Sequence, residues 1–430
     1  MSHLPSASLG HYASLSIVVI GGGRRLEIKG KGMSKANAEI LIVGGGIIGL
    51  TIARELIQEG YKDIVIIDKE KNLGKHASGR NSGVLHAGIY YAPDSLKARS
   101  CLNGNFLMRT YCKEKGLPIL ESGKVIVTRS EKEIETLKEL YRRALANGAK
   151  VDMVSERELN DIEPNARTVQ KAIYSHNTAV VDPKKVVLSL EKDLAASGKV
   201  KFLLNCGFLG MKGSSIAVTS SGEIEFKRFI NAAGAHCDRV ARAFDLGLNL
   251  RMIPFKGIYK KLIRDKTHLV RGNIYPVPDI RNPFLGIHFT RSAHGEVYLG
   301  PTAIPALGRE NYGILEGIDA EAFSILFRDA VLFCANPKFR DVALTEPKKY
   351  LTPFFFNSAS KLVKKLDPRD IEPADKVGIR AQLVDWDRKE LVLDFLVQKE
   401  GESIHILNPV SPAFTSSMDL ARTIVRDYFD

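Results

Sequence analysis

The 430-residue sequence contains few cysteines, a single tryptophan and no long apolar run. Its cysteines are scattered, at Cys101, Cys112, Cys206, Cys237 and Cys334. Because no two of them form a C-x-x-C pair, the sequence offers neither a zinc site nor a disulfide framework, and a reducing compartment is the simpler interpretation. No apolar stretch approaches the roughly 20 residues that span a bilayer, and no secretory cleavage site follows residues 15–20. We therefore expect a cytoplasmic protein without a metal ion.

Acidic residues are also in deficit, with 49 Asp and Glu against 62 Lys and Arg and a net charge of +13. Such an excess attracts nucleic acid, an anionic membrane or anionic small molecules. The sequence contains no arginine-rich run and no RNA-binding signature, so we expect no nucleic-acid partner. Two interpretations of the charge remain: a solvated lysine-rich surface, or a peripheral contact with the inner face of the cell membrane.

The remaining composition, 44% hydrophobic and 26% charged, suits roughly two or three domains with buried cores. The first clear strand begins only after residue 38, and Met33 precedes it closely. We therefore expect either that residues 1–38 are a disordered extension or that Met33 is the working start of the chain.

Residues 39–68 have the order of a βαβ unit that binds a dinucleotide. A short apolar run predicts a strand buried on both faces, and Gly44, Gly46 and Gly49 follow it in G-x-G-x-x-G spacing. The first glycine permits the tight turn, the second lets the backbone approach a pyrophosphate, and the third lets the helix pack on the sheet. The helix N-terminus offers N–H groups to the phosphates, and Asp68, after a second apolar run, can accept a hydrogen bond from a ribose hydroxyl. The alternative is a glycine-rich turn in an ordinary α/β protein.

Segments further along the chain extend this pattern. Small and hydroxyl-bearing residues dominate 77–83, where the backbone can pass close to a bulky ligand. Residues 229–235 predict a strand that runs into small residues, either to approach a nucleotide or for close packing. Strand-like runs alternate with turns across 252–300 and predict an antiparallel sheet. Helices are expected at about 319–336, 347–366 and 418–428. Ser416 or Ser417 is the natural N-cap of the last helix.

Several longer blocks carry a family resemblance. They are NSGVLHAGIYY at 81–91 with Lys97-Ala98-Arg99, PFKGIY at 254–259, GNIYPVP at 272–278, PFLGIHFT at 283–290, GPTA at 300–303, GIRAQ at 378–382 and NPVSPAFTSS at 408–417. With the βαβ unit, these blocks make the chain resemble flavin-dependent oxidoreductases of the D-amino-acid-oxidase-like class. Within that class it is similar to the L-2-hydroxyglutarate oxidase and dehydrogenase family. The resemblance covers nearly all of residues 38–430.

The resemblance implies an α/β fold in which a Rossmann-type FAD-binding domain is interleaved with a substrate domain built on an antiparallel sheet. It implies FAD as the cofactor. The FAD-binding domain is expected at 39–115, 176–252 and 375–430, and the substrate-binding domain at 116–175 and 253–374. Residues expected to contact FAD are Gly44, Gly46, Ile47, Ile48, Gly49, Asp68, Lys69, Ser78, Asn81, Ser82, Gly83, Ala233, Gly234, Ser411, Pro412 and Thr415.

The implied reaction is oxidation of L-2-hydroxyglutarate to 2-oxoglutarate. A hydride passes from the substrate α-carbon to flavin N5 while a base takes the hydroxyl proton. The electrons then need an acceptor, for which oxygen, a quinone and an electron-transfer flavoprotein all remain open. The alternative enzyme is a related FAD oxidoreductase acting on an amino acid or glycerol 3-phosphate. The alternative from another class is a basic FAD protein that serves tRNA modification.

Histidine suits the role of the base, because its ordinary pKa lies near neutrality. The candidates are His288 and His86, since both lie in blocks that the resemblance places around the flavin. A histidine that only hydrogen-bonds the cofactor or the backbone is the alternative in each case.

The carboxylates of the substrate need cations. The resemblance assigns the α-carboxylate to Arg380, whose planar fork matches a carboxylate, although a surface ion pair is the simpler role for an arginine. Tyr259 can donate a hydrogen bond to the substrate, and Lys256 or Arg99 can meet the distal carboxylate. The family usually has arginine where Lys256 stands, and lysine lacks the bidentate fork.

Overall fold

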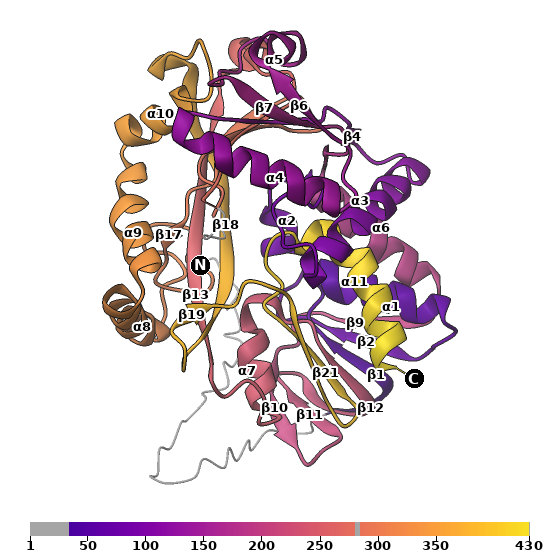
Figure 1. Ribbon diagram of the computed structural model, residues 1–430. Helices are drawn as coiled ribbons and strands as arrows, with labels where there is room; N and C mark the ends of the chain where they lie inside the picture. Colours follow the sequence, from indigo (N-terminus) through magenta and orange to yellow (C-terminus); the bar gives the residue numbers. More distant parts are fainter. Residues whose placement is uncertain (1–33, 280–283, 430) are drawn as a thin grey trace, which may run out of the picture.

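The computed structural model describes residues 34–279 and 284–429, which fold around two large β-sheets and a small one (Figure 1). The expected start at Met33 and most of the expected extension lie outside the described residues. Residues 34–38, however, belong to the first strand, β1 (Ser34–Val43). The strand begins before its apolar run because Ser34 to Ala38 pair with the first residues of strand β12. Among the described helices, none is long and apolar enough to cross a membrane.

The first sheet contains the predicted βαβ unit. Its core strands run parallel, and alternate residues of β1 face opposite ways: Ile40 and Ile42 pack among helices on one face, and Leu41 and Val43 pack on the other. β1 is thus buried on both faces, as predicted. The strands in spatial order are β10 (Phe208–Lys212), β11 (Ile216–Thr219), β12 (Gly222–Asn231), β1, β2 (Ile64–Ile67) and β9 (Val200–Leu203), with β21 (Ser403–Leu407) paired to β12 and β20 (Leu396–Glu400) paired to β21.

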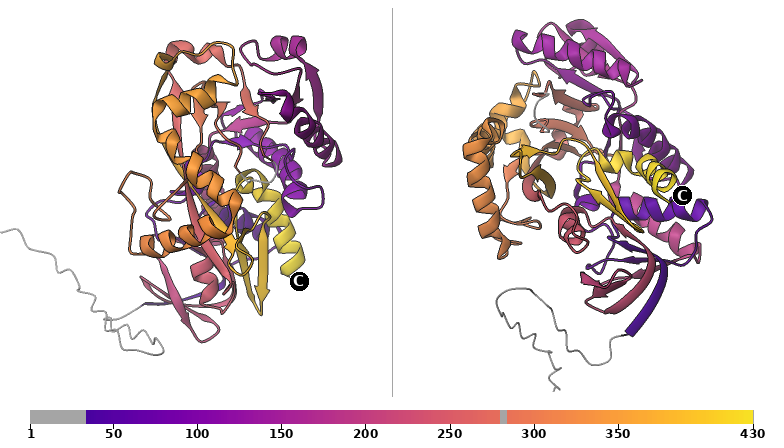
Figure 2. Two further views of the ribbon diagram at one scale, coloured as in Figure 1. Left: turned by 60° about the vertical axis from the view of Figure 1, so that its left-hand side comes forward. Right: turned by 60° about the horizontal axis from the view of Figure 1, so that its bottom comes forward.

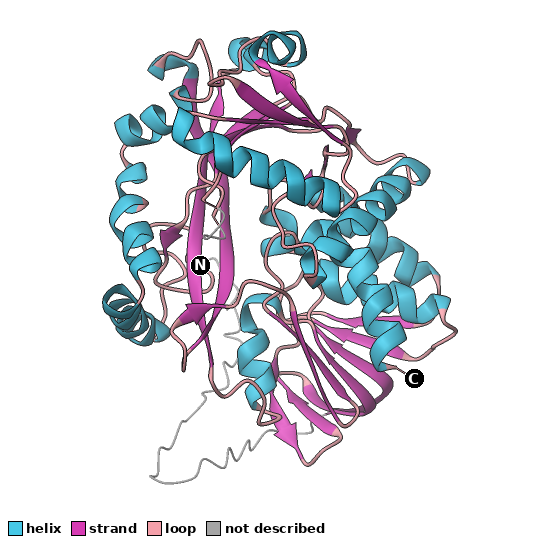
Figure 3. Ribbon diagram, in the orientation of Figure 1, coloured by secondary structure: helices cyan, strands magenta, loops and turns pink. Residues whose placement is uncertain are grey.

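Four helices gather beside this sheet (Figure 3): α1 (Ile47–Gln58), α3 (Leu96–Glu114), α6 (Pro183–Ala196) and α11 (Ala413–Tyr428). On the apolar face of α1, Leu50, Ala53 and Leu56 are buried and Ile57 is partly buried, and Gly60, with φ +94°, follows the end of the helix. The short helix α7 (Cys237–Arg242) follows β12 and packs Val240 against the opposite face of the sheet. The helices therefore leave the carboxyl ends of β1 and β12 open to the centre of the molecule.

The second sheet is mostly antiparallel, as the sequence predicts. Its longest pairing joins β13 to β18, from Leu250 opposite Asp385 to Leu262 opposite Ile371. β5 and β14 pair in parallel, so the expected segments 116–175 and 253–374 contribute to one sheet. The strands in spatial order are β19 (Glu390–Leu391), β18 (Ile371–Asp385), β13 (Leu250–Leu262), β16 (Val297–Gly300), β15 (His288–Arg291), β14 (Asn273–Pro276), β5 (Lys124–Val127), β7 (Lys171–Ser175) and β6 (Val151–Ser155), with β17 (Ile304–Pro305) paired to β13. β18 crosses the expected boundary at residue 375 and belongs to this sheet on both sides of it.

The strands of the small sheet alternate along the chain with strands of the two large sheets. It consists of β3 (Val84–Leu85), β8 (Ala179–Val181) and β4 (Ile119–Leu120). Helices α4 (Ile134–Ala146) and α5 (Glu156–Ile162) accompany β6 and β7. Helices α8 (Glu321–Ala335), α9 (Pro337–Thr345) and α10 (Thr352–Ser360) form an outer layer at the far side of the second sheet (Figure 2).

Two helix predictions need correction. The helix expected at 347–366 is a 3-10 turn, Pro347–Tyr350, followed by α10, because Pro347 and Pro353 each lack an N–H donor and each open a new helical piece. The last helix begins at Ala413 rather than Met418. Ser416 and Ser417 therefore lie in its first turns and not at its N-cap, and the Ser417 hydroxyl donates back to the Phe414 carbonyl.

Candidate active site

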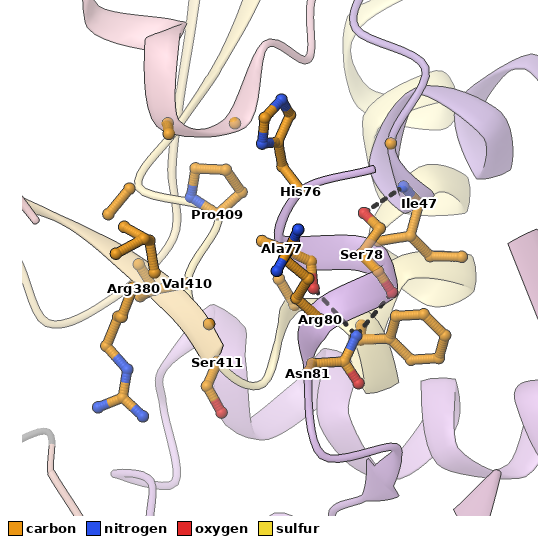
Figure 4. A pocket seen from close by; sticks show the side chains of 18 of the residues that line it. Ile47, His76, Ala77, Ser78, Arg80, Asn81, Arg380, Pro409, Val410 and Ser411 are labelled. Atoms are coloured by element: carbon orange, nitrogen blue, oxygen red, sulfur yellow. Dashed lines mark hydrogen bonds between the residues drawn. The ribbon is translucent and has the colours of Figure 1, made fainter. Parts of the chain in front are cut away.

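A cavity of about 700 Å³ lies between the two large sheets, a size typical of sites that hold a cofactor and a substrate. Its walls come from the β1–α1 turn, residues 74–86, the end of β12, β13, β18 and the loop before α11 (Figure 4). Of the site residues predicted from the sequence, all but Gly49, Gly83, Arg99 and Lys256 line it. Residues far apart in the sequence thus converge on one site.

The β1–α1 turn has the shape that a pyrophosphate needs. Gly44 has φ +114°, and a Cβ there would lie 2.4 Å from the Ala232 carbonyl oxygen, so β12 approaches too closely for any side chain. A Cβ on Gly49 would lie 2.1 Å from the Gly44 oxygen, which explains the third glycine as a packing position. The N-cap Gly46 leaves the start of α1 without a side-chain cap of its own. The positive end of the helix therefore faces the cavity.

Two polar side chains hold this turn. Ser78 Oγ accepts a hydrogen bond from the Ile47 N–H at 2.9 Å (Figure 4). Asp68 Oδ2 accepts one from the Gly45 N–H at 2.9 Å, at the end of β2. Asp68 therefore lies where the βαβ motif requires an acid for a ribose.

A second helix N-terminus, that of α11, reaches the cavity. Its N-cap is Pro412, which has no side-chain cap, and the loop before it lines the cavity. Thr415 fixes the helix to β3, since its hydroxyl accepts from the His86 backbone N–H at 3.1 Å and donates to the Val84 carbonyl at 3.2 Å. The uncapped N-terminus of α11, the glycine turn before α1 and the acid Asp68 fit FAD, whose pyrophosphate and reduced ring both carry negative charge.

The other end of the cavity gathers the polar groups expected for the substrate. His86 follows β3, Tyr259 lies on β13, His288 on β15 and Arg380 on β18. Tyr275 on β14 joins them, and its ring centroid lies 3.8 Å from that of His288. The Arg380 guanidinium lies 5.0 Å from the Phe284 ring, at the cavity wall (Figure 4). The predicted bases and the predicted carboxylate partner thus share one pocket.

Both histidines are neutral at pH 7. Burial lowers the pKa of His288 to about 3 and the pKa of His86 well below its ordinary value. His288 Nδ1 lies 2.8 Å from the Gly286 carbonyl oxygen, which can only accept, so Nδ1 carries the proton and Nε2 keeps its lone pair. His86 Nδ1 is buried without a hydrogen-bond partner among the described residues.

The two cations predicted for the distal carboxylate lie elsewhere. Lys256 Nζ donates to the Gly313 carbonyl at 2.6 Å, and Lys256 does not line the cavity. Arg99 is exposed on α3 and does not line it either. The fold therefore places neither Lys256 nor Arg99 in the pocket that His86 and His288 line.

A segment that sequence reasoning missed crosses the dinucleotide end of the cavity. We call residues 309–312, between β17 and α8, the clasp. Arg309 is buried with Asp238, and Glu310 lies 2.6 Å from Lys69 and 2.9 Å from His236. Among the residues in these contacts, Lys69 alone was predicted from the sequence, because no local sequence motif marks the clasp.

The clasp also contributes an aromatic ring. The Tyr312 hydroxyl lies 2.8 Å from His76 Nδ1, and the Arg80 guanidinium lies 3.9 Å from the Tyr312 ring centroid. Glu70, His76 and Glu310 come close enough to hold a metal ion. Lys69 Nζ, however, lies 2.6 Å from both carboxylates and supplies the positive charge there.

Comparison with known proteins agrees with this geometry. Residues 39–424 match the family model described as FAD dependent oxidoreductase. The chain is 34% identical to the mitochondrial L-2-hydroxyglutarate dehydrogenase of Bos taurus, over 96% of this chain and 94% of that protein. It is 35% identical to the human protein of the same name, over 91% of this chain and 88% of that one. It is 34% identical to L-2-hydroxyglutarate dehydrogenase of Escherichia coli O17:K52:H18, over 90% and 92%.

Solved structures share the fold. One is the L-alpha-glycerophosphate oxidase from Mycoplasma pneumoniae with FAD bound, with TM-score 0.72, 21% identity and coverage of 91% of this chain and 94% of that one. Another is the glycine oxidase from Geobacillus kaustophilus, with TM-score 0.66, 18% identity and the same coverage. At these identities the likeness shows the fold alone. The chain belongs to the DAO family of FAD-dependent oxidoreductases, and its cofactor is FAD.

Proposed function

We propose that this enzyme oxidises L-2-hydroxyglutarate to 2-oxoglutarate. The relatives named L-2-hydroxyglutarate dehydrogenase support this substrate, because they match at 34–36% identity over most of the chain. The observation that carries the chemistry is the pocket that joins Arg380 to two neutral histidines. Bound FAD supplies the hydride acceptor at N5.

The pocket offers a separate group for each task. Arg380 binds the α-carboxylate through its planar fork, which orients the α-carbon. The Tyr259 hydroxyl donates to the substrate. His288 Nε2, with its lone pair kept by the Nδ1 contact to Gly286, takes the hydroxyl proton. His86 is the alternative base, because it lines the same pocket and is equally neutral.

Anaerobic mixing tests the substrate directly. The purified FAD-bound enzyme is mixed with L-2-hydroxyglutarate, its D-enantiomer, glycerol 3-phosphate or glycine, and the flavin band at about 450 nm is followed. We expect rapid bleaching with L-2-hydroxyglutarate and none with the other three compounds. Bleaching by glycerol 3-phosphate or glycine but not by L-2-hydroxyglutarate would overturn the proposal.

We also propose that the enzyme makes a peripheral contact with an anionic membrane through the outer layer of α8, α9 and α10. Large apolar side chains are exposed there, including Phe323 (81% exposed) and Phe327 on α8 and Ile314 (85% exposed) just before it. Lys338 and Lys348 are exposed in the same layer. Apolar side chains that enter a headgroup region, with lysines that pair with anionic lipid, form a surface of this kind. A membrane quinone would then be the acceptor within closest reach.

A further inference from the structure

Lys124, the first residue of β5, is a buried lysine without a counter-ion in the part of the chain that the structure describes. Its side chain is 1% exposed, and its Nζ has no hydrogen-bond partner among the described residues. The ammonium lies against two aromatic faces, 4.6 Å from the Tyr90 ring centroid and 4.9 Å from that of Tyr275. Such contacts recover only part of the hydration that a buried ammonium loses, so an unpaired lysine in this position is costly.

Lys124 lies directly behind the wall of the substrate pocket. Tyr275, which it contacts, lines the cavity and packs its ring on His288. The charge of Lys124 adds to burial in lowering the pKa of both His86 and His288, so the ammonium is close to both. The charge of Arg380 also lowers the pKa of the same two histidines. Two buried cations therefore flank the histidines, and Arg380 already matches one carboxylate.

Two other buried polar groups near Lys124 also lack a hydrogen-bond partner among the described residues. They are the Tyr90 hydroxyl and His86 Nδ1. Burial lowers the pKa of Lys124 to about 7, so a carboxylate placed beside it would restore its charged form. A carboxylate of the substrate would supply a partner for the buried polar groups that the folded chain leaves without one.

We propose that Lys124, which lies behind the cavity wall against the rings of Tyr90 and Tyr275, receives the distal carboxylate of a five-carbon dicarboxylate. This inference rests on the proposed function, and it names the specificity group that Lys256 and Arg99 do not supply. The four-carbon stem of lysine gives Nζ the reach to meet a carboxylate at the pocket wall. Arg380 and Lys124 would thus bind the two ends of the substrate and set its length.

The test compares two substrates that differ only at the distal end, L-2-hydroxyglutarate and L-2-hydroxypentanoate. For Lys124→Met we expect kcat/KM with L-2-hydroxyglutarate to fall about 100-fold, mainly through KM, because one partner of a buried charge pair is lost. The rate with L-2-hydroxypentanoate should hardly change, so the preference for the dicarboxylate disappears. Lys124→Arg, which keeps the charge, should retain part of the preference.

Lys376 provides a matched control. It is half-buried on β18, also against two tyrosine rings, at 5.3 Å from Tyr259 and 4.7 Å from Tyr298. Unlike Lys124, it is not among the charges that lower the pKa of His86 and His288. Lys376→Met removes a half-buried lysine of the same sheet and should leave the substrate preference unchanged.

A binding measurement separates this inference from the proposed function. Glutarate lacks the hydroxyl and cannot be oxidised, so its Kd can be read from the shift of the flavin spectrum without turnover. Lys124→Met should raise the Kd of glutarate about 100-fold and leave that of butyrate unchanged. If the wild-type flavin is not reduced by L-2-hydroxyglutarate, the proposed function fails, and the glutarate comparison still decides the role of Lys124.

Two results would overturn the inference. One is equal glutarate affinity in Lys124→Met and the wild type. The other is an equal loss of kcat/KM on both substrates with a shifted pH profile, which would mean that Lys124 acts through the histidines. Should Lys124→Met fail to bind FAD, Lys124→Gln, which keeps a polar end, carries the same comparison.

Discussion

The Glu310 carboxylate lies 2.6 Å from the Lys69 ammonium, and this ion pair joins the clasp to the residue directly after Asp68, the acid at the end of β2. Glu310 also lies 2.9 Å from His236 Nε2, at the helical turn that follows β12. Glu310 lies in the loop that follows β17, a strand of the second sheet, whereas Lys69 and His236 follow β2 and β12 of the first sheet. The contact therefore holds the two sheets together over the dinucleotide end of the cavity.

Glu310→Gln should loosen the clasp and speed the loss of FAD. Lys69 is partly exposed, so we expect a modest effect, with FAD dissociating roughly 3- to 10-fold faster, as for a partly solvated ion pair. The measurement is the rise of free-flavin fluorescence after dilution. Glu316→Gln changes an exposed glutamate of the same loop and should leave the rate unchanged. An equal release rate in Glu310→Gln and the wild type would exclude a role for the clasp in retaining FAD.

His288→Asn tests which histidine is the base. Removal of the base should lower kcat about 10²- to 10⁴-fold while glutarate still binds, because asparagine keeps a polar side chain of similar shape but takes up no proton. His86→Asn should have the smaller effect. Stopped-flow flavin reduction gives both rates, and the reverse order of the two losses would assign the base to His86.

The pH dependence of kcat/KM should report a buried base. The folded pKa of His288 is about 3, below its ordinary 6.5, so the imidazole stays neutral and able to accept a proton at pH values where a free histidine is charged. We expect kcat/KM to be flat through pH 7 and to fall only well below pH 6.5. An acid limb centred at or above pH 6.5 would show that the base is solvated.

The lowered pKa of His288 also makes the free energy of unfolding depend on pH. Below pH 6.5 the unfolded chain protonates this histidine and the folded chain does not, so its contribution to stability is complete above 6.5 and is lost as the pH falls toward 3. Wild type should therefore lose more stability than His288→Asn between pH 6.5 and about 4. Urea unfolding at several pH values measures the difference.

The outer helices should bind anionic vesicles. We expect the enzyme to float with vesicles that contain phosphatidylglycerol and to stay in solution with phosphatidylcholine alone, because lysines and apolar side chains act together. Replacing Phe323 and Phe327 with glutamate should abolish flotation. Leu145→Glu, at an exposed leucine on α4, is the control. Unchanged flotation of the double variant would place any membrane contact elsewhere.

The dinucleotide end of the site could be predicted because its residues are close in sequence. Gly44, Gly46 and Asp68 owe their positions to two neighbouring strands, one turn and one helix, so their spacing alone carries the geometry. Arg380 and His288 came from a family resemblance, and the fold brings them together from β18 and β15.

The remaining contacts depend on tertiary packing. Glu310 meets Lys69 across 241 residues of chain, and Lys124 meets Tyr275 because β5 pairs with β14. No local pattern marks either pair. The start of α11 was misplaced for a related reason: Ser416 and Ser417 look like capping residues, but both lie inside the packed helix, where the Ser417 hydroxyl donates to the helix backbone.

The position of α11 has a consequence for biosynthesis. This helix, the last element described, supplies one wall of the FAD site, and β21 just before it completes the first sheet beside β12. The glycine turn, by contrast, lies far upstream of α11 in the sequence. During synthesis the cavity therefore lacks the α11 wall long after the glycine turn is made, and we expect FAD to bind only once α11 has packed against α1 and α3.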